Sequence, residues 1–170
     1  MIGILFFMKI EIREYSKKDH EGLVEMATGL IDLMSSIDPQ RLFRPKDDFD
    51  ARQYIDARLK KVLDENGKVF VAFVDQKPAG YLMATIEETT GVDALNKFPM
   101  KKGVIDALFV SDAFRGHGIS TLLLEKIEQY FKDKGCGYSE ISCLSANEDA
   151  RNVYLKKGYQ ERCIDFLKKL

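Results

Sequence analysis

The spacing of apolar residues predicts two helices in the first third of the chain. Alternation over Lys9 to Arg13 predicts a strand before them, and Ser16 and Asp19 can cap the first helix, which ends near Ser36. A loop with two prolines, Ile37 to Pro45, leads to the second helix, which Asp47 or Asp48 can cap and Asn66-Gly67 ends. The apolar positions of both helices recur every three or four residues: Leu23, Met26, Ala27, Leu30, Ile31 and Met34, then Ile55, Leu59, Val62 and Leu63.

Apolar runs in the middle of the chain predict strands. Val69 to Val74 is unbroken, which is typical of a strand buried on both faces, and a turn joins it to a second strand, Gly80 to Ile86. Glu87 to Lys102 is mixed and predicts a long connection that faces solvent or substrate. The remaining elements alternate: a strand Val104 to Val110, a helix Ile119 to Phe131, a strand Ser139 to Leu144, a helix Asn147 to Lys157 ended by Gly158, and a closing strand Tyr159 to Leu167. Strand, helix, strand and helix in succession require a parallel strand pair, so the fold class is mixed α/β.

Length and charge narrow the class of protein. We treat residues 1–170 as a single domain, with residues 1–8 as an N-terminal extension that starts at Met1 or Met8. The 26 basic and 27 acidic side chains leave a net charge of -1, which argues against a nucleic-acid partner. The apolar start is too short to span a membrane. Three cysteines and two histidines without metal-like spacing predict free thiols, no metal site and a cytoplasmic location.

The segment Phe114 to Ser120 predicts an anion-binding loop between a strand and a helix. The first amides of a helix have no partner within it and lie at the positive end of the helix dipole. Gly116 and Gly118 let an anion approach the backbone, and Arg115 adds a positive charge. A triphosphatase loop is excluded because no Gly-Lys followed by Ser or Thr occurs here. A dinucleotide fingerprint fits poorly because Thr121 replaces its third glycine.

Two motifs, in order, resemble those of the GNAT superfamily of N-acetyltransferases. Arg115-x-x-Gly118-x-Ser120 is similar to its Arg/Gln-x-x-Gly-x-Gly/Ala loop, with Ser120 as a departure. Asn147-x-x-Ala150-x-x-x-Tyr154-x-x-x-Gly158-Tyr159 is similar to its downstream signature. The resemblance implies a GNAT-like fold of the α+β type: a mixed, mostly antiparallel central sheet with a parallel strand pair at the cofactor site, flanked by about four helices.

The resemblance also implies acetyl-coenzyme A (acetyl-CoA) as the co-substrate. Its pyrophosphate would lie on the loop amides, and its pantetheine along the preceding strand and against Asn147. Tyr154 would be the general acid for the departing thiolate. Because a phenol has a pKa of about 10 and a thiol about 8.5, we expect Tyr154 to act mainly by hydrogen bonding. The residues implied to bind the cofactor are Leu108, Phe109, Val110, Arg115, Gly116, His117, Gly118, Ile119, Ser120 and Asn147.

An acceptor amine must lose a proton before it attacks a thioester. Candidates for the base are Asp106, Glu87 and Glu140, and a water held by backbone carbonyls is an alternative. Asp106 precedes Leu108 and Val110 by two and four residues, which on a regular strand places all three on one face. Asp106 also matches a position where some polyamine-type relatives carry an acid.

We therefore expect direct transfer of acetyl from acetyl-CoA to a primary amine of a small molecule or peptide, without a covalent enzyme intermediate. Cys143 is expected to be a buried thiol without a catalytic role. Two alternatives are a coenzyme A-binding module without turnover and a nucleotide-dependent oxidoreductase that binds NAD. Charges of both signs in residues 37–48 and 87–102 leave the acceptor open. A homodimer would match a common family habit.

Overall fold

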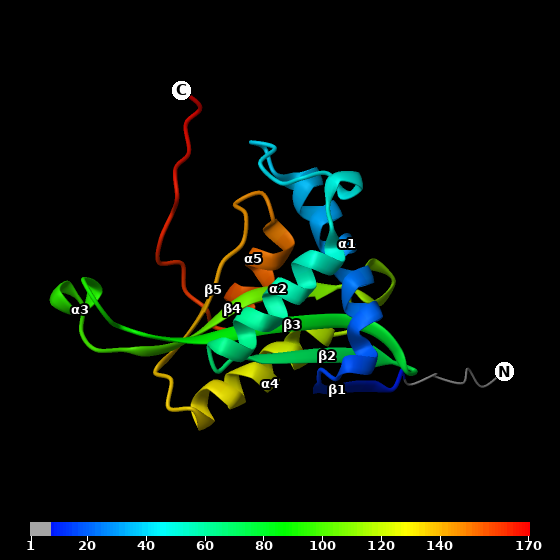
Figure 1. The fold of residues 1–170 in the computed structure, drawn as a ribbon, viewed down its shortest axis with the longest axis horizontal. Helices are drawn as coiled ribbons and strands as arrows, with labels where there is room; N and C mark the ends of the chain where they lie inside the picture. Colours follow the sequence, from blue (N-terminus) through cyan, green and yellow to red (C-terminus); the bar gives the residue numbers. More distant parts are fainter. Residues whose placement is uncertain (1–7) are drawn as a thin grey trace.

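The computed structural model describes residues 8–170, which form a five-stranded sheet with its strands in chain order (Figure 1). Neighbouring strands are antiparallel except for β4 and β5, which are parallel. The mixed sheet with one parallel pair confirms the predicted fold class. The strands are β1 (Ile10–Glu14), β2 (Lys68–Val74), β3 (Lys77–Glu88), β4 (Lys101–Val110) and β5 (Tyr138–Ile141). Apart from Met8, the predicted N-terminal extension lies outside the described residues.

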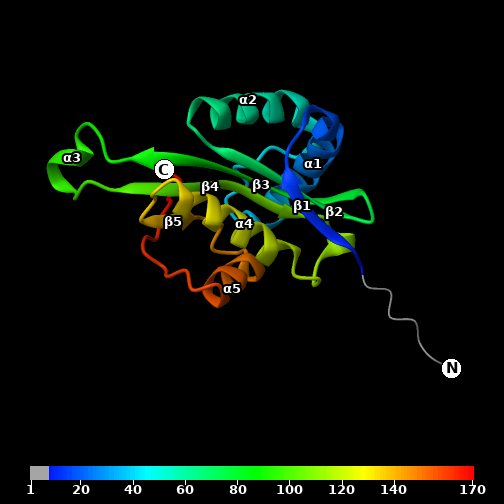
Figure 2. The same ribbon diagram turned by 90° about the horizontal axis from the view of Figure 1, so that it is seen from below.

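Helices cover both faces of the sheet (Figure 2). The first pair packs on one face, the second pair on the other, and a single short helix lies at the tip of the β3–β4 ribbon. These helices are α1 (His20–Ile37) and α2 (Ala51–Asp64), α4 (Ile119–Asp133) and α5 (Glu148–Lys156), and α3 (Asp93–Asn96). None of the helices within residues 8–170 has the length and apolar character needed to cross a membrane.

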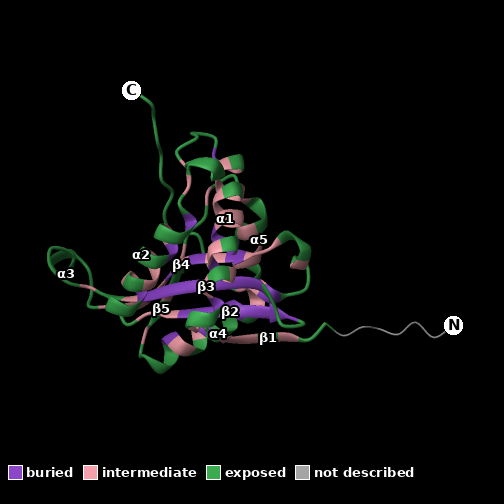
Figure 3. Cartoon of the chain, turned by 45° about the vertical axis from the view of Figure 1, so that its right-hand side comes forward, coloured by how far each residue is buried: buried purple, intermediate pink, exposed green. Residues whose placement is uncertain are grey.

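Each face of the sheet has its own apolar core, and buried residues concentrate in the central strands between the two cores (Figure 3). Every β2 residue from Val69 to Val74 is buried, as the unbroken apolar run predicts, because its side chains alternate between the two cores. On the α1 and α2 side, Leu23 and Ile55 are fully buried. On the α4 side, Leu123 and Ile127 are fully buried. The central strands are therefore anchored from both sides and form a rigid base for the edge at β4.

The predicted long connection between residues 87 and 102 lies mainly outside the strands: only its first two and last two residues belong to β3 and β4, and residues 89–100 contain the short helix α3. β3 and β4 continue into a ribbon in which Glu87 pairs with Lys102 and Glu88 with Lys101. The ribbon projects beyond the body of the molecule and ends in α3 (Figure 1). Periodicity missed the extension because charged residues on a two-stranded ribbon face water and carry no apolar alternation.

The predicted closing strand, Tyr159 to Leu167, is wrong: the chain has no regular structure after α5 and Gly158. Among its apolar side chains, Ile164 is 77% exposed and Phe166 93% exposed. A strand forms only where another strand offers its backbone, and residues 160–170 pair with no strand of the described chain. An apolar sequence is therefore insufficient evidence for a strand at this position.

Candidate active site

The outer edge of β4 opens where β5 separates from it. The two strands pair from Lys102 and Tyr138 up to Ile105 and Ile141. β4 then continues to Val110, whereas β5 ends. Residues 106–110 therefore have no strand partner on that side among the described residues, and their outward N–H and C=O groups can bind an extended ligand. The predicted cofactor strand, Leu108 to Val110, lies on this open edge.

A β-bulge lies at the point of separation. Met83 faces Ala107 and Ala84 faces Ile105, so Asp106 is an extra residue in β4. Leu108 packs in the core on the α4 side, whereas Asp106 contacts α2 on the opposite side. The expected common face for Asp106, Leu108 and Val110 is wrong, because the bulge interrupts the alternation on which it was based.

The predicted anion-binding loop lies just beyond the end of β4. Gly116 and Gly118 have φ values of +78° and +77°, which glycine adopts without strain. The amide N–H groups of residues 116–120 make no hydrogen bond within the described chain. Ile119, the first residue of α4, is 1% exposed and anchors the helix, while Ser120 is half-buried beside it. Several free donors thus gather at the positive end of α4.

Two side chains fix the shape of this loop. Arg115 Nε donates to the carbonyl of Val110 at 3.1 Å, and its guanidinium pairs with Asp112 at 2.8 Å. The Arg115 side chain is still 43% exposed, so it can also meet an anion. The ring Nδ1 of His117 lies 3.3 Å from the carbonyl oxygen of Phe114, and this contact gives His117 a structural role within the loop.

The N-terminus of α5 carries the second predicted motif. Asn147 caps the helix, since its Oδ1 accepts from the amide of Ala150 at 3.1 Å. This bond leaves the side-chain NH₂ of Asn147 available to a ligand. Sequence reasoning assigned Asn147 to a ligand and missed this structural role, although Asn at a helix start is its signal.

Tyr154 of α5 packs in the core on the α4 side, with its ring 6.1 Å from that of Tyr159. Burial, and then the neighbouring Cys143 and Tyr159, raise the pKa of Tyr154 well above its ordinary value. The Tyr154 hydroxyl makes no hydrogen bond within the described residues, so it remains a free donor at neutral pH. Cys143 is exposed, which corrects the expectation of a buried thiol because β5 ends before reaching it.

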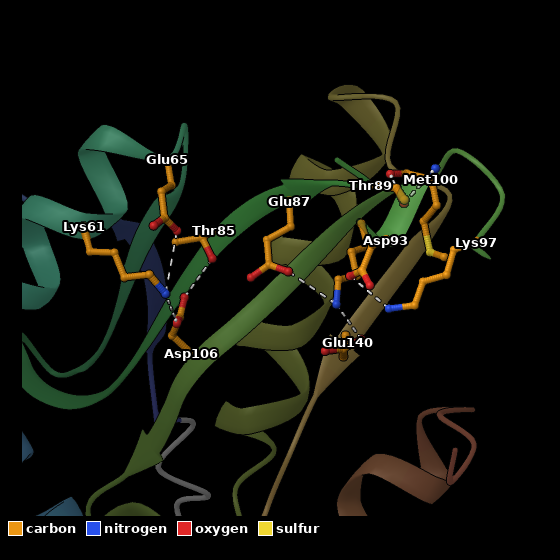
Figure 4. A network of polar contacts seen from close by, with 11 residues as sticks. Lys61, Glu65, Thr85, Glu87, Thr89, Asp93, Lys97, Met100, Asp106 and Glu140 are labelled. Carbon is orange, nitrogen blue, oxygen red and sulfur yellow. Dashed lines mark hydrogen bonds and ion pairs between the residues drawn. The ribbon is translucent and has the colours of Figure 1, made fainter. Parts of the chain in front are cut away.

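Asp106 is held by groups that sequence reasoning missed (Figure 4). Its Oδ1 accepts from Lys61 at 2.9 Å and from Arg58 at 3.3 Å, and its Oδ2 accepts from Thr85 at 3.0 Å. The hydrogen bond to Asp106 raises the pKa of Lys61. These partners precede Asp106 by 21 to 48 residues, so no local pattern could reveal them.

The other two candidate bases share one lysine. Glu87 and Glu140 lie 3.4 and 2.9 Å from the Lys102 ammonium. This group lies beside the Asp106 cluster, along the ribbon formed by β3 and β4 (Figure 4). All three acidic candidates are therefore brought to one region, but each is paired with a cation.

One hollow lies along the β3–β4 ribbon, beside Glu87. An open depression of about 850 Å³ is lined by residues that include Ile86, Glu88, Lys101 and Lys134. Lys134 follows the C-terminal end of α4, about 20 Å from its N-terminus at 1.5 Å per residue. The hollow is therefore separate from the anion-binding loop.

The comparisons with known proteins agree with this arrangement. A model of the acetyltransferase (GNAT) family matches residues 30–159. An uncharacterized N-acetyltransferase of Methanocaldococcus jannaschii is 30% identical over 112 residues, 66% of this chain and 46% of the relative. The chain thus spans about half the length of that relative.

Solved structures share the fold. A protein of Bacillus halodurans superposes with a TM-score of 0.80 at 21% identity, over 94% of this chain and 99% of that one. A glucosamine-6-phosphate N-acetyltransferase of Arabidopsis thaliana has a TM-score of 0.66 at 19% identity, over 95% and 98%. A predicted acetyltransferase of Clostridium acetobutylicum, solved with acetyl-CoA, has a TM-score of 0.69 at 18% identity, over 95% of this chain and 96% of that one. With a family model that matches most of its length, this chain belongs to the GNAT family of acetyltransferases.

Proposed function

We propose that this enzyme transfers the acetyl group of acetyl-CoA to a primary amine of a small molecule or peptide. The observation that carries the proposal is the meeting of an anion-binding loop with an unpaired strand edge at one end of β4. A pyrophosphate fits the free amides of residues 116–120 with Arg115 beside them. A pantetheine chain has amides that can pair with the open edge from Leu108 to Val110.

Acetyl-CoA supplies an activated thioester. Side chains of the protein accept a proton from the amine and stabilise the departing thiolate. The loop follows Val110, so a cofactor held there and extended along β4 directs its thioester toward Asp106. Asp106 takes the proton from the acceptor ammonium, which leaves the nitrogen lone pair free to attack. Tyr154 donates a hydrogen bond to the departing sulfur; its raised pKa makes it a hydrogen-bond donor rather than an acid that gives up its proton.

The two groups approach from opposite faces of the open edge. Asp106 faces α2, whereas Tyr154 packs with the core on the α4 side. An amine that arrives over Asp106 and a thiolate that leaves toward Tyr154 therefore lie on opposite sides of the reacting carbonyl. This separation supports direct transfer without an enzyme-bound acyl group.

The acceptor and the setting complete the proposal. Structural neighbours include an enzyme that acts on glucosamine 6-phosphate, which supports a small-molecule amine for this chain too. The free thiols of Cys136, Cys143 and Cys163 fit a reducing compartment, and we place the enzyme in the cytoplasm. We also propose that the enzyme forms a homodimer and that it binds neither a nucleic acid nor a membrane.

Calorimetric titration with acetyl-CoA, with NAD as the control ligand, tests the proposal. We expect micromolar binding of acetyl-CoA and no heat with NAD. A broad amine screen for thiol release then separates the enzyme from a coenzyme A-binding module, which would bind and release none. Absence of acetyl-CoA binding would refute the function.

The two ends of α4 offer a matched pair of variants. Gly118 and Gly135 have φ values of +77° and +73°, and a Cβ added at either position would meet no atom within 4 Å, so Ala strains both backbones alike. We expect Gly118→Ala to weaken acetyl-CoA binding about tenfold, or about 1.4 kcal/mol, because its loop amides hold the ligand. Gly135→Ala should leave the affinity unchanged. Equal affinities for the two variants would place the cofactor elsewhere.

A further inference from the structure

The Asp106 carboxylate has three of its acceptor positions filled. Oδ1 accepts from Lys61 and Arg58, at 2.9 and 3.3 Å, and Oδ2 accepts from Thr85 at 3.0 Å. A carboxylate offers about four lone-pair positions, so one remains on Oδ2. Only 9% of the side chain is exposed, and the two cations therefore act more strongly on it than they would at an open surface.

The two cations are fixed on one face of α2. Arg58 and Lys61 are three residues apart, which places them on neighbouring turns. Arg58 Nε also donates to the Tyr54 hydroxyl at 3.2 Å, and its guanidinium lies 5.3 Å from the Tyr54 ring centre. Lys60, between them, is exposed and makes no ion pair within the described residues.

We propose that Arg58 and Lys61 are positioning residues for acetyl transfer, which hold the Asp106 carboxylate in place and leave its one open Oδ2 position to the acceptor ammonium. The inference rests on the proposed function and extends it to α2, a helix outside both sequence motifs. We call Arg58 and Lys61 the clamp. Asp106 is the first residue of β4 past its last pair with β5, so the clamp acts at the point where the two strands separate. The acceptor therefore enters over the α2 face of the sheet.

The clamp works within a defined set of charges. The titratable and charged groups near Asp106 come from α2, β3, β4 and β5. They are Arg58, Lys61 and Glu65 of α2, with Tyr54 behind them; Thr85, Glu87 and the buried Tyr81 of β3; Lys102 of β4; and Glu140 of β5. Lys61 lies 2.9 Å from Asp106, the shorter of the two cation contacts, so its loss should have the larger effect.

Steady-state kinetics at one pH, with the amine and acetyl-CoA varied in turn, test the clamp. Without Lys61, Asp106 loses the shorter of its two cation contacts, so its carboxylate should no longer be held at the opening. We expect Lys61→Met to lower kcat about tenfold with little change in the affinity for acetyl-CoA, because a misplaced base slows proton transfer without touching the cofactor. Lys61→Arg should keep most of the activity, and Lys60→Met should match the wild type.

Other outcomes separate the possible failures. A Lys61→Met variant with wild-type kcat, or one that loses acetyl-CoA affinity in the same proportion as kcat, would reduce Lys61 to a structural contact and overturn the inference. Asp106→Asn should lose transfer activity while acetyl-CoA still binds, and adding Lys61→Met to it should cause no further loss. An Asp106→Asn variant with wild-type turnover would show that the base lies elsewhere, which also overturns the clamp. Loss of acetyl-CoA binding in the wild type, by contrast, would be a failure of the proposed function itself.

Discussion

At the scale of single residues, the Arg13–Asp19 pair makes the clearest contribution to stability. Arg13 donates two hydrogen bonds to Asp19, at 2.7 and 2.6 Å, and Asp19 also accepts from Ser16. Chiefly through the bond from Arg13, the pKa of Asp19 falls from 3.8 to about 2. Because the folded-state pKa is depressed, the pair stabilises the protein above pH 4 and loses that effect as the pH falls toward 2.

We expect Asp19→Asn to lower the free energy of unfolding by roughly 2 kcal/mol at pH 7. The difference from wild type should shrink as the pH falls through 3.8 to about 2, and urea unfolding across this range measures it. Glu21→Gln is the control, since its pair with Arg52 is exposed and should contribute little to stability. A pH-independent effect of Asp19→Asn would disprove the linkage.

Tyr154→Phe tests the role of one hydroxyl. The ring still packs in the core, so we expect little change in acetyl-CoA affinity but a loss of roughly 100-fold in kcat. The control is Tyr159→Phe, whose hydroxyl bonds Ser139 and Glu128 and serves the structure instead. Steady-state kinetics and acetyl-CoA titration of both variants measure these effects. Wild-type turnover in Tyr154→Phe would show that catalysis does not need the hydrogen bond from this hydroxyl. Because its pKa is raised, Tyr154 should add no alkaline limb near neutral pH.

At the scale of elements, the pattern of apolar residues predicts strands and helices well wherever an element is buried on one or both faces. The pattern over Val69 to Val74 predicted β2, and the cap and glycine signals bounded α2 and α5 within a few residues. The bulge at Asp106 could not be predicted, because it arises from a register shift against β3 rather than from any residue in β4 alone. One extra residue moves a candidate base to the opposite face of the sheet.

The conformation of the loop before α4 was predictable for a different reason. Two glycines with left-handed φ shape it, so residue type and order specify it directly. The clamp on Asp106 depends instead on side chains of α2, 45 and 48 residues earlier. Residue patterns report local conformation, whereas such contacts follow only from how α2 packs on the sheet.

At the scale of the whole molecule, the C-terminal segment is where sequence and structure differ most. Residues 164–170 contain Ile164, Phe166, Leu167 and Leu170, all exposed, although their composition is that of a strand. Removing them should change the free energy of unfolding by less than about 1 kcal/mol, because they bury little apolar surface. The removal should also reduce self-association, since exposed apolar side chains promote it.

Two truncations measured by urea unfolding and light scattering check this expectation. A chain that ends at Cys163 loses only the exposed segment and keeps the Arg151–Glu161 pair. A chain that ends at Gly158 also loses Tyr159, whose half-buried ring and hydroxyl join α5, β5 and α4, and it should be clearly less stable. If the chain ending at Cys163 is as unstable as the chain ending at Gly158, residues 164–170 pack on the sheet in solution. The free edge of β5 would then carry the closing strand that the composition predicts.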